Sequence, residues 1–205
     1  MSLLCEFIVK RQVQDGTQLR VTRRQANYML EYAVCSSVES RWLIDYLICE
    51  CKSTWVDWCA CVAARAGKVD TFSYLVRTHG ASITQGVIGC CMSRNRGVAT
   101  LDEIVREFDL SDQDLQSISV DDGQSLLHLA VTELNPEMIR HLVDTYNFDV
   151  YELDASENTP LELLLDIKEY AEAAVEIFSD KEEEDFQHCR EVLELIQSNQ
   201  HVLTE

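Results

Sequence analysis

Proline and glycine are scarce in this chain, whose 205 residues include only two Pro and seven Gly. This scarcity excludes a collagen-like fibre and a Pro/Gly-rich disordered chain, and it leaves no obvious linker. No apolar run approaches the roughly 18 residues that a bilayer-spanning helix needs, since even Trp42–Ile48 contains Asp45. Because 46% of the residues are hydrophobic, we expect a soluble protein with a packed core in one or two domains.

A secretory signal is also lacking near the N-terminus. Glu6 interrupts the apolar residues there, and Lys10 and Arg11 follow these residues instead of preceding them. The nine cysteines are an odd number, and without an export signal we expect reduced thiols, because disulfides do not persist in a reducing compartment. The sequence thus predicts a cytoplasmic or nuclear protein.

Basic residues are few and unevenly distributed. Residues 1–100 hold twelve Lys and Arg against eight Asp and Glu, a net charge of +4. Residues 101–205 hold five Lys and Arg against 28 Asp and Glu, a net charge of −23. An anionic surface of this kind repels nucleic acid and anionic lipid and favours a basic partner. We therefore expect no nucleic-acid ligand and no membrane association.

Two parts of the chain match at a fixed distance. Ala63 and Ala130 lie in similar short segments, each followed by an apolar helical pattern. The tetrapeptides that begin at Ser125 and Thr159 are also similar, and their spacing indicates a period of about 33 residues. The separation of Ala63 from Ala130 is twice this period, so one further unit lies between them. We call this separation the two-repeat offset.

The segment Asp122–Ala130, with its tight turn before Ser-Leu-Leu-His, resembles the opening of an ankyrin repeat, and Asn158–Leu161 resembles the start of the next repeat. The resemblance covers residues 54–165 best. It implies an all-α solenoid of about five stacked helix pairs joined by short turns. It also implies that a partner protein binds to the concave face formed by turn tips and first helices. The fold alone does not identify that partner.

The predicted organisation has three parts. Residues 1–24 form an N-terminal cap, for which the sequence leaves both a hairpin and a helix open. Residues 25–199 form the solenoid and residues 200–205 a tail, while the structure of 166–185 stays undetermined. Within the solenoid we expect Ser125 to hydrogen-bond His128 at a helix start and Pro160 to occupy a first helical turn, where its missing N–H costs nothing.

The residues expected to contact a partner lie at turn tips or at the ends of first helices. We expect the partner to present a basic segment to them. The predicted contact residues are Asp121, Asp122, Asp154, Ser156, Glu157, Thr132, Glu133 and Arg65.

Four closely spaced cysteines, Cys49, Cys51, Cys59 and Cys61, suggest an alternative function in metal or redox sensing. Within each pair a single residue separates the cysteines, whereas zinc sites usually have two to four intervening positions. We therefore expect these cysteines to act as small apolar side chains without a bound metal.

No catalytic motif or nucleotide loop occurs in the sequence, and we expect neither enzymatic activity nor a cofactor. His128 is accounted for by Ser125, and His79, which precedes Gly80, is expected at a helix end.

Overall fold

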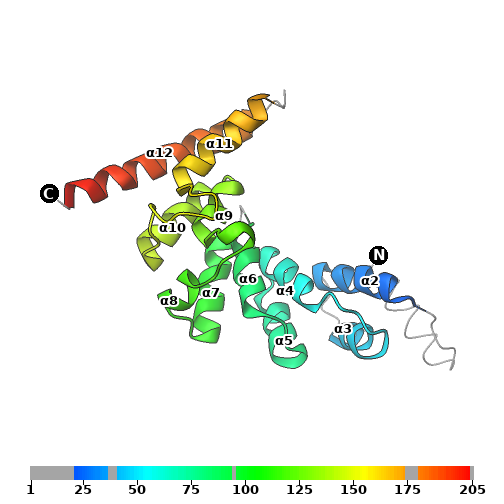
Figure 1. Cartoon of the computed structure of the whole chain (residues 1–205). Helices are drawn as coiled ribbons and strands as arrows, with labels where there is room; N and C mark the ends of the chain where they lie inside the picture. The colour runs from blue at the N-terminus through cyan, green and yellow to red at the C-terminus, as the bar shows by residue number, and fades with distance from the viewer. Residues whose placement is uncertain (1–20, 37–40, 94–95, 174–179, 204–205) are drawn as a thin grey trace. The chain divides into compact units, whose positions relative to one another are not determined.

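The computed structural model describes residues 21–36, 41–93, 96–173 and 180–203 (Figure 1). Within these ranges the chain is helical, with no β-strand and with one isolated bridge between Ser119 and Ser125, so the all-α prediction is confirmed there. No helix in the same ranges is long and apolar enough to cross a bilayer. The cap predicted for residues 1–24 lies almost wholly outside the described residues.

The helices follow one another with short connections. They are α2 (Arg23–Cys35), α3 (Arg41–Asp45), the π-helical turn η1 (Tyr46–Glu50), α4 (Val56–Arg65), α5 (Val69–His79), α6 (Ile83–Cys91), α7 (Gly97–Phe108), α8 (Asp112–Gln116), the 3₁₀ turn η2 (Asp121–Gly123), α9 (Leu126–Thr132), α10 (Pro136–Tyr146), α11 (Pro160–Ala173) and α12 (Asp180–Leu203).

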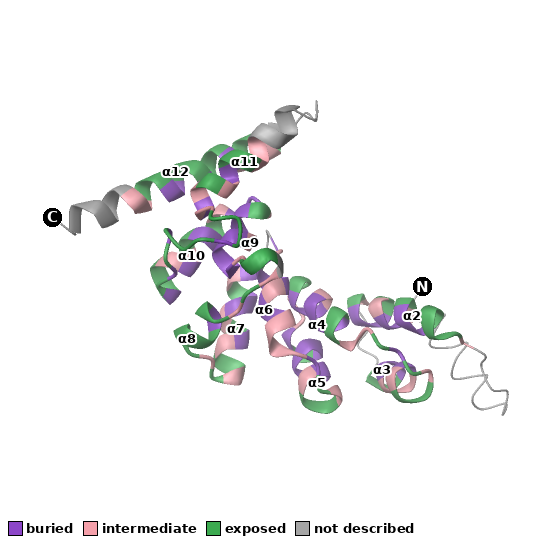
Figure 2. Ribbon diagram, in the orientation of Figure 1, coloured by how far each residue is buried: buried purple, intermediate pink, exposed green. Residues whose placement is uncertain are grey.

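The chain forms two compact units, residues 1–89 and 90–205, called unit 1 and unit 2 below. In unit 1, α2 packs against α3, η1 and α4, and α4 packs against α5. The buried side of each helix faces its neighbours (Figure 2). Leu30, Phe72 and Leu75 are fully buried. Helix pairs with their first helices in contact are therefore the building principle of this unit.

Polar bonds fix the order of α2 and α4. The side chain of Asn27 bonds the Ser53 hydroxyl at 2.9 Å and the Thr54 N–H at 3.0 Å, just before α4 begins. Beyond the end of α4, the Lys68 ammonium donates to the carbonyl oxygens of Val34, at 2.9 Å, and Ser36. These carbonyls lie at the end of α2, where no intrahelical donor remains. The two helices consequently run in the same direction.

Unit 2 repeats the arrangement. The first helices α9 and α11 pack on each other, the second helices α7, α10 and α12 pack in sequence order, and α9 packs on α10. Helix α8 occupies the lengthened exit of the preceding pair, and its N-terminus is capped reciprocally by Ser111 and Asp114. Helix α12 includes the acidic run 182–185 and extends to Leu203, inside the predicted tail.

The two-repeat offset reappears in the backbone of the two units. Ala63 and Ala130 are both fully buried, each in a first helix, and each carbonyl accepts an N–H from beyond the helix end, Lys68 at 2.9 Å and Asn135 at 3.0 Å. Positive φ angles also recur at this offset, in the pairs Gly67 and Leu134 (70° and 50°) and Gly80 and Asn147 (71° and 55°). The equivalence predicted from sequence thus extends to the turns and helix ends.

Small residues allow neighbouring helices to approach closely. A Cβ atom added at Gly89 in α6 would collide with the backbone carbonyl of Cys61 in α4, and one at Gly97 would collide with the carbonyl of Cys90. Backbone atoms cannot rotate away as a side chain can. These two glycines therefore set the spacing between helices.

Replacing Gly89 with Ala is expected to destabilise the fold. The collision with Cys61 should cost about 1–3 kcal/mol, more than the ~1 kcal/mol that a helical Gly→Ala change normally gains. The measurement is chemical unfolding of the full chain. Gly80→Ala, which introduces backbone strain at positive φ but meets nothing within 4 Å, is the control. A Gly89 variant as stable as the parent chain would contradict the close approach.

Candidate functional site

The acidic residues predicted to bind a partner fall in two turns of unit 2, residues 121–123 and 154–158, which we call the turn surface. The Ala155 N–H donates to the carbonyl oxygen of Asp122 at 2.9 Å, and a Cβ atom on Gly123 would lie 3.4 Å from Ala155. The two turns thus lie side by side although α9 and α10 separate them in sequence. They bring together five of the predicted contact residues.

Asp154 shapes this surface from within. Only 8% of Asp154 is exposed, and its Oδ1 atom accepts the backbone N–H groups of Ser156 and Asn158, each at 2.9 Å. An aspartate that bonds the backbone two positions ahead stabilises a turn. Its carboxylate is therefore committed to the fold, and its contact with a partner stays a prediction.

The exposed charges of the turn surface are Asp122 and Glu157. Both residues have positive φ angles, 58° and 64°, which a turn requires and which aspartate tolerates better than most residues. Ser156 is also exposed. The side chain of Asp121 lies outside the described part of the structure. Asp122 and Glu157 are accordingly the carboxylates best placed to meet a ligand.

His128 holds the turn surface to α9. The fully buried imidazole accepts the Ser125 hydroxyl at Nδ1, at 2.9 Å, and the Ser125 N–H at 3.3 Å, while its Nε2–H donates to the Asn158 carbonyl at 3.1 Å. The bond between Ser125 and His128 is the one that the spacing predicts. The same imidazole also bonds the second turn, at Asn158. Pro160 is buried in the first turn of α11, directly after that turn.

The remaining predicted contact residues lie elsewhere. Thr132 and Glu133 are at the opposite end of α9, where the Thr132 hydroxyl donates to the His128 carbonyl at 3.0 Å. Arg65 is exposed in the last turn of α4, in unit 1. Sequence reasoning missed Tyr151 and Leu153, which are 39% and 55% exposed and immediately precede the second turn. Apolar side chains are therefore exposed beside the acidic residues of the turn surface.

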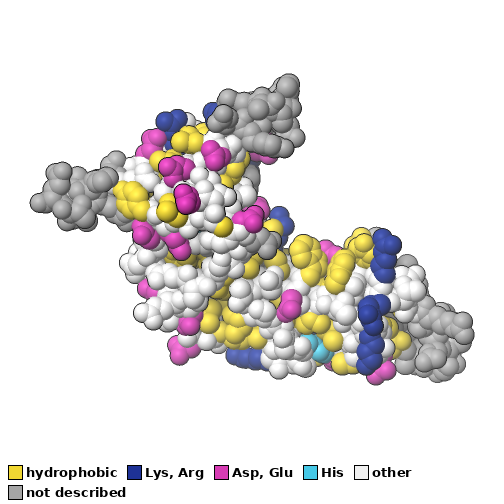
Figure 3. Space-filling view, in the orientation of Figure 1, with side chains coloured by type: hydrophobic (Ala, Val, Ile, Leu, Met, Phe, Trp, Pro, Cys, Tyr) yellow, Lys and Arg dark blue, Asp and Glu magenta, His cyan; other side chains and the backbone are white. Residues whose placement is uncertain are grey.

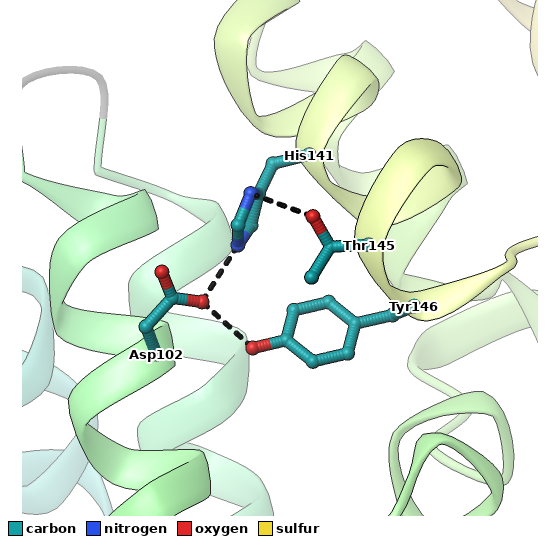
Figure 4. Close-up of polar contacts among 4 residues, drawn as sticks. All are labelled: Asp102, His141, Thr145 and Tyr146. Atoms are coloured by element: carbon teal, nitrogen blue, oxygen red, sulfur yellow. Dashed lines mark hydrogen bonds and ion pairs between the residues drawn. The ribbon is translucent and has the colours of Figure 1, made fainter.

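A second polar cluster joins α7 to α10 (Figure 4). The Asp102 Oδ1 atom accepts the Tyr146 hydroxyl and the His141 Nε2–H, each at 2.7 Å, and the Thr145 hydroxyl lies 3.2 Å from His141 Nδ1. Burial, together with the bond to Asp102, raises the pKa of Tyr146. The hydroxyl therefore stays a proton donor at any physiological pH.

Unit 1 contains the same arrangement. Asp45 Oδ1 accepts the Tyr74 hydroxyl at 2.6 Å and His79 Nε2–H at 2.8 Å. The bond to Asp45 raises the pKa of Tyr74 to about 12. The His79 side chain thus bonds the preceding second helix, a role that its expected place at a helix end did not predict.

The ring residues of the two clusters occupy equivalent positions with their side chains exchanged, whereas Asp45 and Asp102, 57 positions apart, do not follow the two-repeat offset. The two-repeat offset relates Tyr74 to His141, and it also relates His79 to Tyr146. In both clusters the rings meet edge to face, with centroids 5.6 Å and 5.3 Å apart. One carboxylate ties consecutive second helices in each unit, and we call these clusters the aspartate clamps.

The order Thr145, His141, Asp102 resembles a nucleophile, base and acid, but the surroundings favour a structural role. Asp102 is shared with Tyr146, and the clamp of unit 1 is built without a threonine. A cavity of about 310 Å³ adjoins Asp102, and its lining includes Asn135. The Asn135 amide is engaged by the Ser93 carbonyl and the Met138 N–H, each at 3.1 Å. The side chains of Asp102 and Asn135 are therefore occupied by bonds within the fold.

The paired cysteines differ in environment. Cys59 and Cys61 are buried, Cys51 is half-buried and Cys49 is exposed. Burial raises the pKa of Cys59 to about 12, so its thiol stays protonated at neutral pH. Among the residues that the structure describes, no three His, Cys, Asp or Glu side chains form a group that could hold a metal ion.

Comparison of this chain with family models, with curated protein sequences and with solved structures found no match.

Replacing Asp102 with Ala should lower the free energy of unfolding by about 1–3 kcal/mol, because Tyr146 and His141 then lose their acceptor. Glu103→Ala, at the exposed neighbouring position of α7, should change stability by no more than about 0.5 kcal/mol. Thermal and urea unfolding followed by circular dichroism measure both. Equal losses in the two variants would contradict the clamp.

Alkylation should separate the thiols by burial. At about pH 8, iodoacetamide is expected to modify the exposed Cys49 long before Cys59 and to leave Cys59 unmodified until the chain unfolds, because the thiolate is the reactive form. Peptide mass spectrometry after a time course measures the order, and labelling in urea supplies the unfolded control. Early modification of Cys59 in the folded chain would refute its burial.

Proposed function

We propose that this chain is a protein-binding module without catalytic activity, an ankyrin-type solenoid of helix pairs whose turn surface receives a basic segment of another protein. The observation that carries the proposal is the pairing of the two turns through Ala155 and Asp122, with Asp122 and Glu157 exposed on it. The backbone geometry repeated at the two-repeat offset supports a repeat architecture.

Charge supports the choice of partner. Unit 2 carries seven Lys and Arg against 28 Asp and Glu, a net charge of −21. A basic segment is attracted to this field, whereas nucleic acid and anionic membranes are repelled by it. The reduced state that we expect for the cysteines fits a cytoplasmic or nuclear location.

The solenoid also suits the role structurally. His128 and Asp154 hold the two turns through buried bonds, so the exposed carboxylates sit on a rigid support. A preorganised surface loses little entropy when it binds. The alternative, metal or redox sensing by Cys49, Cys51, Cys59 and Cys61, predicts bound zinc or a disulfide in the purified protein, which elemental analysis and thiol titration would detect.

Reversing the exposed charges of the turn surface tests the proposal. Partners are captured from lysate with the full chain and identified, and the affinity of each is then measured for the double variant Asp122→Lys, Glu157→Lys. We expect binding at least about tenfold weaker near 0.1 M salt, equivalent to ~1.4 kcal/mol, and a reduced dependence on salt. Asp154 is left unchanged because it maintains the turn.

The matched control is the double variant Glu103→Lys, Asp144→Lys. It makes the same charge change at exposed positions of the second helices α7 and α10. Circular dichroism must show that both variants are folded. Equal losses in the two variants would mean that total charge, and not the turn surface, governs binding.

A further inference from the structure

Unit 1 exposes large aromatic side chains on its first helices. Tyr28 and Tyr32, one turn apart on α2, are 45% and 61% exposed, and Trp58 on the adjacent α4 is 47% exposed. Together with Trp55, which precedes α4, they form what we call the aromatic face. Figure 3 shows hydrophobic side chains gathered over α2 and α4, with basic side chains at the N-terminal end of α2.

The core beneath this face is complete without these side chains. Ala26 and Leu30 of α2 and Ala60 and Ala63 of α4 are fully buried between the helices. Exposed aromatic groups of this size cost free energy in water, and contiguous exposed apolar patches mark interaction sites. Tyrosine and tryptophan are also the side chains that contribute most at protein interfaces.

The aromatic face is partly preorganised. The rings of Tyr28 and Trp55 meet edge to face with centroids 5.1 Å apart, which fixes both side chains. The cap of α2, in which Thr22 and Gln25 bond reciprocally, holds the start of the helix. Little side-chain entropy would therefore be lost at these positions on binding.

Positive charges bracket the aromatic rings. Arg24 lies one helical turn before Tyr28, and Arg65 lies two turns beyond Trp58 on the same side of α4. Because α2 and α4 run in the same direction, the two arginines lie towards opposite ends of the face. The acidic residues nearest in sequence are Glu31, which is half-buried, and Asp57, which accepts the Ser82 N–H at 2.7 Å.

We propose that the aromatic face binds a segment of another protein that carries bulky apolar side chains flanked by Asp or Glu. The rings receive the apolar side chains, and Arg24 and Arg65 pair with the flanking carboxylates. This site is distinct from the turn surface in unit and in charge preference. It rests on the proposed function only in that both assign protein binding to the chain.

The test begins with random short peptides displayed on phage and selected on the full chain. Enriched peptides should combine net negative charge with Leu, Phe or Trp. A synthetic peptide of an enriched sequence is then titrated against the full chain and its variants. Trp58→Ala and Tyr32→Ala should each weaken binding by about tenfold or more, since truncation of a central aromatic contact commonly has that effect.

Charge is tested separately. The double variant Arg24→Glu, Arg65→Glu should weaken binding of the acidic peptide and strengthen binding of the same peptide with Lys in place of Asp and Glu. Leu195→Ala, a truncation of another exposed apolar side chain at 57% exposure, is the control and should leave binding unchanged. Circular dichroism melts verify the fold of every variant.

Each contrary result has a defined meaning. Selection of basic peptides only, with binding lost in the Asp122, Glu157 variant, would overturn this inference and leave the proposed function standing. Failure to enrich any peptide, or enrichment insensitive to Trp58, would overturn it as well. A dimer that dissociates on Trp58→Ala would show that a second copy of the chain occupies the face, and RNA binding abolished by the same variant would also replace the proposed ligand.

Discussion

Close contact between neighbouring helix backbones is the constraint on which the rest of this structure depends. One helix pair cannot bury its own apolar stripe, so its stability comes from the next pair, and the gain in dispersion energy falls steeply with distance. In unit 1 that distance is kept short by Gly89, which lies against the Cys61 carbonyl. Ala60 and Ala63 are small, fully buried side chains of α4. The clamps and turns require this spacing, since their bonds join one pair to the next.

The features that sequence predicted are those set by a few neighbouring residues. Ser125 and His128 face each other across a single helical turn at a helix start, and Pro160 fits a first turn wherever the helix packs. The match of Ala63 with Ala130 was visible because a tight helix contact accepts few side chains. These patterns predicted the all-α class. They did not predict how one helix pair packs on the next.

The aspartate clamps, which sequence missed, depend on long-range contacts. Asp45 and Asp102 each bond side chains of a helix far along the chain, and the exchange of Tyr and His between the two clamps hides their equivalence in an alignment. Asp154 is acidic and lies at a turn tip, as expected of a contact residue, yet its carboxylate stabilises its own turn. The partners of Asp45 and Asp102 depend on the tertiary fold, whereas Asp154 bonds the backbone of its own turn, a local pattern that sequence reasoning missed.

Under the two binding proposals, local charge and not the total decides what each unit binds. The chain carries −19 overall, but unit 1 holds ten Lys and Arg against eight Asp and Glu, a net charge of +2. Salt screens exposed charges beyond about 10 Å at 0.1 M, so a bound segment responds mainly to the side chains that it touches. An acidic chain can therefore present arginines to an acidic ligand at one surface and carboxylates to a basic ligand at another. Under both proposals, selectivity is set by the exposed residues at each contact.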